Sequence, residues 1–299
     1  MHTSISSGTC YPDRKWLADD RFGVKIFHGT VVNQKSYNYL LAVQIMNDIR
    51  DYNPENQSVL GRLLEELSWV GSTINSYREG GRGFENVLTA EVFQALDFLP
   101  RNSFLGKIVE ASRGAKSSRE ILIKEIEQAE FSLLPGNYYL TPSGDRHQTK
   151  LPVQPDGLIE TKNIYLVLEA KRIRRSSFQP EQLAREFVLA LRESGPKKPL
   201  LYLILGAEPP VSINKNGKKD IKEAIEMYLE PVLKRAERHS LTKEYALSKI
   251  DDVVCWITWD EIQRIIEESV KYLEIENASI KNSIRRVAQS ISNSIEWHK

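Results

Sequence analysis

Apolar runs alternate with amphipathic segments over residues 84–259, and this alternation predicts an α/β fold. The apolar runs have the length and composition of strands, and the longest are typical of strands buried on both faces. The predicted strands are 137–141, 152–160, 164–171, 199–206 and 252–259. The segments between them carry apolar residues at helical spacing. The predicted helices are 84–99, 117–131, 181–194 and 218–238. This order favours a mixed β-sheet flanked by helices.

Residues 1–80 predict a helical N-terminal region. Apolar side chains recur there at steps of three and four in two segments. They are Tyr39, Leu40, Val43, Ile45 and Met46, followed by Leu60, Leu63, Leu64, Leu67 and Val70. The glycine-rich segment 78–83 marks a join, and it lacks the Lys-Ser/Thr ending of a phosphate-binding loop. We therefore expect an α/β core over residues 81–260.

Residues 261–299 predict a C-terminal helical extension. An apolar stripe recurs along it at helical spacing, formed by Ile280, Ile284, Val287, Ile291 and Ile295. The stripe could pack within the chain, onto the N-terminal helices. Alternatively, it could pair with a second copy of the chain.

The composition is that of a soluble globular protein, with 41% hydrophobic and 27% charged residues. A net charge of +1 gives no global basic field, so that a nucleic-acid partner would require a local basic patch. The two cysteines, Cys10 and Cys255, lack metal-ligand spacing and suggest a reducing compartment. No apolar run approaches the roughly 20 residues that span a bilayer. We expect a cytoplasmic protein that is not in a membrane.

Charged residues interrupt the predicted strands at one place. Glu169 and Lys171 end the apolar run 164–171 and lie two residues apart, so they share a face of the strand. A hairpin turn centred on Lys162 and Asn163 places Asp156 opposite Glu169. Three charged side chains then share one face, and burying them is costly unless they are paired or hold a metal ion.

A divalent cation accounts for this cluster. Two facing carboxylates repel each other, and oxygen ligands suit Mg²⁺, with Mn²⁺ as an alternative. Lys171 would add a positive charge beside a metal-bound water. Two carboxylates, a lysine and a hydrated metal ion are together the groups needed to orient a hydroxide and to stabilise a pentavalent phosphorus. An ion pair between Glu169 and Lys171 is the competing explanation. It does not explain why Asp156 shares their face.

Pro155-Asp156, followed by Glu169-Ala170-Lys171, resembles the motif of the PD-(D/E)xK nuclease superfamily. The resemblance implies a restriction-endonuclease-like fold over residues 84–259. It also implies that Asp156 and Glu169 hold Mg²⁺ and that Lys171 positions the attacking water.

The same resemblance implies two further site residues on the flanking helices. Members of the superfamily commonly carry an acidic residue on the helix before the sheet. Glu85 is the first choice for this third acidic metal-site residue, and Glu91 is the second choice. Members also often carry a polar helix after the lysine strand, where Gln182 is the expected inward residue.

Basic residues surround the predicted hairpin, and such residues contact nucleic-acid phosphates without reading sequence. The candidates are Lys162, Arg172, Arg174 and Arg175. A solvated charged loop is the alternative interpretation.

These features favour a Mg²⁺-dependent endonuclease that acts on DNA. Fold-level analogy places it in restriction or anti-phage defence, with other defence proteins as further partners. Cleavage of a duplex needs two active centres or two visits by one, so we also expect a homodimer. Two alternatives stay open: a nuclease-like module that binds DNA or protein without its own catalysis, and an RNA-cleaving toxin.

Overall fold

The computed structural model describes residues 18–19, 24–27, 30–32, 84–140, 151–174, 176–236 and 241–299. The chain divides into two compact units, residues 1–56 and 57–299. In the first unit, β1 (Ala18–Asp19), β2 (Val24–Phe27) and β3 (Thr30–Val32) form an antiparallel sheet that was not predicted. The predicted N-terminal helices, around residues 39–46 and 60–70, lie outside the described residues.

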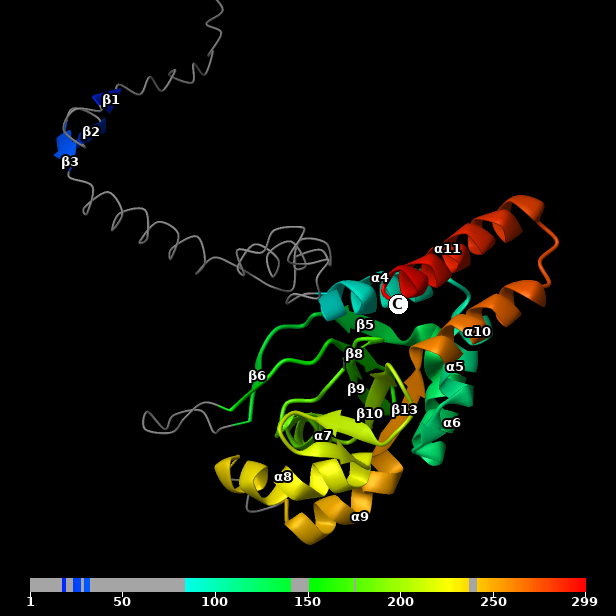
Figure 1. The fold of residues 1–299 in the computed structure, drawn as a ribbon. Helices are drawn as coiled ribbons and strands as arrows, with labels where there is room; N and C mark the ends of the chain where they lie inside the picture. The colour runs from blue at the N-terminus through cyan, green and yellow to red at the C-terminus, as the bar shows by residue number, and fades with distance from the viewer. Residues whose placement is uncertain are drawn as a thin grey trace, which may run out of the picture. The chain divides into compact units, whose positions relative to one another are not determined.

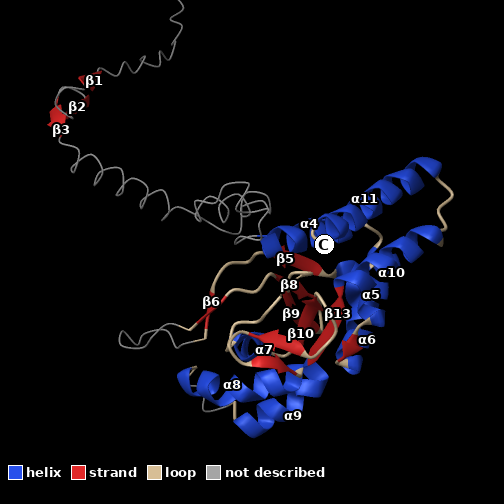
Figure 2. Cartoon of the chain, viewed as in Figure 1, coloured by secondary structure: helices blue, strands red, loops and turns tan. Residues whose placement is uncertain are grey.

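The second unit contains a six-stranded mixed sheet with the order β4-β13-β10-β9-β8-β5. Figure 2 draws strands in red and labels β5, β8, β9, β10 and β13 of this sheet. Its strands are β4 (Arg113–Gly114), β5 (Glu130–Leu133), β8 (Gly157–Glu160), β9 (Ile164–Ala170), β10 (Lys198–Leu205) and β13 (Val254–Thr258). The three strands β9, β10 and β13 are parallel, whereas β8, β5 and β4 pair antiparallel with their neighbours. The prediction of a mixed sheet is confirmed.

Helices cover both faces of this sheet (Figure 1). One face carries α4 (Phe84–Phe98), α5 (Leu105–Ala111), α6 (Lys116–Glu125), α10 (Trp259–Lys271) and α11 (Ala278–Trp297). The other face carries α7 (Gln182–Glu193), α8 (Ile221–Arg235) and α9 (Lys243–Val253). Each face has its own hydrophobic core, so the unit is a three-layer mixed α/β structure.

The central strands are buried on both faces, which explains their continuous apolar sequences. All seven residues of β9 are buried, and so are the last six residues of β10. Fully burying one such aliphatic side chain stabilises the fold by about 1.5–3 kcal/mol relative to its exposed state. A charged residue within β9 therefore occupies a position where an apolar residue would be more stable.

Several predicted boundaries differ from those of the structure. The helix predicted over 117–131 ends at Glu125, and after a 3₁₀ turn the chain forms the edge strand β5. The strand predicted over 152–160 is two strands, β7 (Pro152–Val153) and β8, with a break between them. The predicted strand 137–141 is reduced to β6 (Tyr138–Tyr139), which pairs with β7 outside the main sheet.

Several further elements of the second unit were not predicted, namely β4, α5, α9 and the hairpin of β11 (Val211–Ile213) with β12 (Gly217–Lys219). The strands have two or three residues each and α5 has seven, so few residues carry their periodicity and the sequence signal is weak.

The C-terminal stripe packs within the chain. Ile284, Ala288, Ile291 and Ile295 of α11 are buried in the core that also contains α4 and α10. Ile280, at the start of the stripe, is 51% exposed. Most of the stripe therefore packs within the chain, as in the first of the two interpretations. The helices that it contacts are α4 and α10.

None of the helices in the described ranges is long and apolar enough to cross a membrane.

Candidate metal centre

The hairpin of β8 and β9 has the register that the sequence predicts. Gly157 pairs with Leu168, and Glu160 pairs with Tyr165, so paired residue numbers sum to 325. Asp156 directly precedes β8, and its N–H donates to the carbonyl of Leu168 over 3.1 Å. Asp156 therefore lies beside Glu169 at the end of the hairpin.

The side chain of Glu169 points to the sheet face covered by α7. Along β9, Tyr165 and Val167 belong to the core beneath α7, whereas the even-numbered residues belong to the opposite core. Because side chains alternate along a strand, Glu169 follows Tyr165 and Val167. Its contact with α7 agrees, since Gln182 Nε2 donates to Glu169 Oε1 over 2.6 Å.

Three charged side chains are buried together at this end of the hairpin. Asp156 is 8% exposed, Glu169 is 2% exposed and Lys171 is 7% exposed. Lys171 Nζ donates to Glu169 Oε1 over 2.6 Å, and Asp156 Oδ2 accepts from the Ala170 N–H over 2.7 Å. The predicted competing ion pair between Glu169 and Lys171 is therefore present in the structure. The Asp156 side chain is bound to the main chain of Ala170, the residue between them.

The main chain fixes Lys171 on both sides. Its N–H donates to the carbonyl of Ile204 over 2.8 Å, so the parallel pairing with β10 continues past the end of β9. Its carbonyl accepts a hydrogen bond from Trp259 Nε1 over 2.7 Å. The ammonium lies 5.0 Å from the centre of the Phe178 ring, a cation–π contact that further restricts the side chain.

The cluster contains one acidic residue that was not predicted from the sequence, Glu186 of α7. Glu186 is 1% exposed, and its Oε2 atom has no hydrogen-bond partner. Burial, and then the negative charge of Glu169 within hydrogen-bonding reach, raise the pKa of Glu186 well above its usual value. The sequence feature that could have indicated Glu186 is its position four residues after Gln182. This spacing places both polar side chains on one face of the helix.

The donor set suits a hard divalent cation. Carboxylate oxygens from Asp156 and Glu169, with a buried unpartnered oxygen of Glu186 close by, are the ligand type that Mg²⁺ and Mn²⁺ prefer. No three acidic, histidine or cysteine side chains form a ready-made metal cage within the described part of the chain. Asp156 and Glu169 are directed to the Ala170 N–H and to Lys171, respectively. Metal binding would therefore require these carboxylates to reorient.

The helix before the sheet supplies the two candidates for a further acidic residue. Glu85 belongs to the first turn of α4, but its side chain lies outside the described residues. Glu91 is exposed and lines a surface hollow with Ser294 and Trp297 of α11. The structure therefore does not bring Glu91 to the carboxylates.

The predicted phosphate-contacting residues are separated in the structure. Arg172 is partly buried and Arg174 is exposed, and both follow Lys171 directly. Lys162 lies in the turn at the opposite end of β9 from Glu169, roughly 20 Å away along the strand. Lys162 is therefore not part of the carboxylate cluster, and its contact with nucleic-acid phosphate stays a prediction. Arg175 lies outside the described residues.

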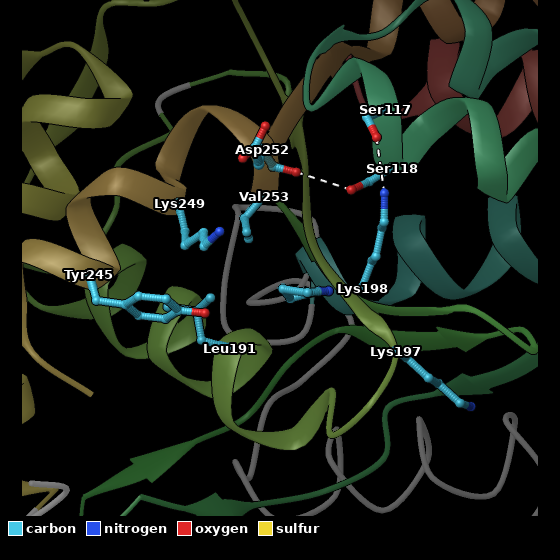
Figure 3. Close-up of a pocket in the computed structure, with 10 residues that line it drawn as sticks. Ser117, Ser118, Leu191, Lys197, Lys198, Tyr245, Lys249, Asp252 and Val253 are labelled. Carbon is cyan, nitrogen blue, oxygen red and sulfur yellow. Dashed lines mark hydrogen bonds between the residues drawn. The ribbon is translucent and has the colours of Figure 1, made fainter. Parts of the chain in front are cut away.

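A separate cavity of about 300 Å³ lies near the start of β10 (Figure 3). Its lining includes Ser117, Lys198, Tyr245, Lys249 and Asp252. Lys198 pairs with Ile164, whereas Leu203 pairs with Glu169, so the cavity lies about 17 Å along the sheet from the carboxylates. It is not part of the candidate metal centre.

Comparison with known proteins gives one weak relative. An uncharacterized protein of Pasteurella multocida (strain Pm70) is 24% identical over 220 residues, which cover 73% of this chain and 70% of that protein. No family model matches the chain. No solved structure matches it either.

Proposed function

We propose that this protein is a metal-dependent nuclease of the PD-(D/E)xK type that hydrolyses phosphodiester bonds, with DNA as its substrate. The observation that carries the proposal is the burial of Asp156, Glu169 and Lys171 together at the end of β9. Three charged side chains in such a position destabilise the fold, and a catalytic centre is a sufficient reason for them.

The topology supports a restriction-endonuclease-like fold. The antiparallel hairpin of β8 and β9 is followed by α7, and the chain then returns as β10 parallel to β9. This is the order of elements that the resemblance implies.

In the proposed mechanism, the carboxylates of Asp156 and Glu169 would hold Mg²⁺ or Mn²⁺, which would supply Lewis acidity and ease deprotonation of the attacking water. Lys171 would orient the attacking water and stabilise negative charge on the phosphate. Gln182 fixes Glu169 through their 2.6 Å hydrogen bond, and Arg172 and Arg174 contact neighbouring phosphates.

We infer that the protein acts in restriction or anti-phage defence, where partner proteins and a homodimer fit the cutting of both DNA strands. Light scattering tests the dimer, and a monomer at all micromolar concentrations, with and without DNA, would remove that part of the proposal.

The nuclease activity is tested with Asp156→Ala and, as a control, Asp252→Ala, which replaces an exposed aspartate at the distant cavity. Purified proteins are incubated with supercoiled plasmid, linear duplex, single-stranded DNA and RNA, in Mg²⁺, Mn²⁺ or EDTA. We expect metal-dependent DNA cleavage by the wild type and by the control, and none by Asp156→Ala. Full cleavage by Asp156→Ala contradicts the proposal. Cleavage of RNA alone favours the toxin, and DNA binding without any cleavage favours the binding module.

A further inference from the structure

Helix α7 places a third carboxyl group against the carboxylate of Glu169. Gln182 and Glu186 lie one helical turn apart, and Gln182 Nε2 donates to Glu169 Oε1 over 2.6 Å. Glu186 is 1% exposed and lies within hydrogen-bonding reach of the same carboxylate. The same helix presents the apolar side chains of Leu183 and Phe187 to the core, so a buried glutamate among them requires a reason.

We propose that Glu186 is a positioning residue of the metal centre, which holds the metal ligand Glu169 from the side of α7. The inference rests on the proposed function, because it assigns Glu186 to the same site.

The charges of the cluster support this role. Asp156, Glu169 and Glu186 are three buried carboxyl groups, and the Lys171 ammonium pairs with one of them. Two buried carboxyl groups in contact cannot both ionise without a large cost, and a divalent cation would remove that cost. Oε2 of Glu186 has no hydrogen-bond partner, so the protein itself does not satisfy this oxygen.

A purely structural role for Glu186 predicts a different outcome. A buried carboxyl that only fills space would be replaced by glutamine with no change in metal affinity. A group that fixes a metal ligand changes metal affinity or activity by about 10- to 100-fold when it is removed. Metal affinity therefore separates the two roles, and it can be measured without any nucleic acid.

The test uses the full chain with Glu186→Gln, Glu186→Asp and the control Glu193→Gln, which replaces an exposed glutamate of the same helix. Mn²⁺ affinity is measured at fixed pH by electron paramagnetic resonance, with circular dichroism as the check on folding. We expect Glu186→Gln to weaken Mn²⁺ binding by about 10- to 100-fold. We expect Glu186→Asp to recover part of the affinity and Glu193→Gln to bind as the wild type does.

Wild-type Mn²⁺ affinity in Glu186→Gln overturns the inference. If that variant does not fold, wild-type affinity in Glu186→Asp overturns it instead, since the shorter side chain cannot hold Glu169 in the same way. In either case the nuclease proposal survives as long as the wild type binds Mn²⁺ and cleaves DNA. A wild type that binds no Mn²⁺ removes both proposals.

Discussion

The indole N–H of Trp259 donates a hydrogen bond to the main-chain carbonyl of Lys171, with 2.7 Å between nitrogen and oxygen. Trp259 is fully buried and is the first residue of α10, directly after Thr258. Thr258 and Glu261 form a capping box that fixes the start of this helix. The lysine of the candidate site is thus held in place by a helix that begins 88 residues later in the chain.

Trp259→Phe removes this donor and replaces the two fused rings of the indole by one six-membered ring. The Lys171 carbonyl then loses a buried hydrogen bond, which costs about 1–3 kcal/mol. We expect the free energy of unfolding in urea to fall by at least this amount, because the lost part of the buried indole also leaves a cavity. We also expect slower DNA cleavage, because Lys171 is less firmly placed, with little change in Mn²⁺ affinity.

Trp256→Phe is the matched control, since Trp256 is partly exposed and packs against the Arg113 guanidinium rather than the site. It should leave the cleavage rate unchanged. Equal cleavage by wild type and Trp259→Phe would show that the hydrogen bond does not position the lysine.

Lys171→Met removes the ammonium and keeps an unbranched side chain that is one atom shorter. Glu169 then loses its buried ion pair, and removing one partner of such a pair costs about 3–5 kcal/mol. We expect a loss of about 3 kcal/mol in EDTA, at the lower end of this range, because Gln182 still donates to Glu169. Mn²⁺ should still bind, while cleavage should fall by about 10²-fold or more.

Lys197→Met is the control for this change, because Lys197 pairs with Glu160 over a similar 2.8 Å distance but at the surface. We expect it to cost less than about 1 kcal/mol and to leave cleavage intact. If Lys171→Met cleaves DNA as the wild type does, Lys171 has no part in the reaction.

Gly206 lets the chain that leaves Lys171 pass close to the end of β10. A Cβ atom at Gly206 would lie 2.3 Å from the Arg172 carbonyl oxygen and 2.4 Å from the Ile173 carbonyl oxygen. Both are backbone atoms, so Gly206→Ala forces the main chain to shift. We expect a loss of about 1–3 kcal/mol in urea unfolding, together with slower cleavage.

Gly106→Ala gives the opposite expectation, because Gly106 lies within α5 and its nearest contact to a Cβ atom would be 3.4 Å. Alanine there stabilises a helix by about 0.5–1 kcal/mol relative to glycine. Equal stability of the two variants would contradict the proposed crowding at Gly206.

The register of the hairpin could be predicted because it depends on local information. The turn at Lys162 and Asn163 sets the pairing, and one residue of slip would move Glu169 to the other face. The break between β7 and β8 could not be predicted in this way. Tyr138 and Tyr139 pair with Pro152 and Val153 outside the main sheet, and this pairing is a tertiary interaction that the strand sequence does not reveal.

The candidate site was predicted only in part for the same reason. Asp156, Glu169 and Lys171 follow from the pairing of two neighbouring strands. Glu186 comes close to Glu169 because α7 packs on the sheet, which is a tertiary interaction. No sequence motif marks a helical residue four positions after Gln182. Lys162 is close in sequence but lies at the far end of a seven-residue strand.

The C-terminal helix provides a pH-dependent prediction away from the metal centre. His298 is buried, and its Nδ1 lies 2.8 Å from the carbonyl oxygen of Ser294. Burial lowers the pKa of His298, while the Ser294 carbonyl and the charge of Glu91 partly oppose this effect. The folded protein therefore takes up a proton less readily than the unfolded chain, whose histidine titrates near pH 6.5.

The stabilisation from a neutral His298 is complete above about pH 6.5 and is lost as the pH falls through and below that value. The loss cannot exceed about 1.4 kcal/mol per pH unit for a single proton. His298→Gln binds no proton in either state, so its free energy of unfolding should decline less between about pH 7.5 and pH 5.5. Urea titrations of both proteins across this range measure the difference. Parallel curves would show that His298 is protonated equally in the folded and unfolded states, and that its burial does not make the docking of α11 sensitive to acid.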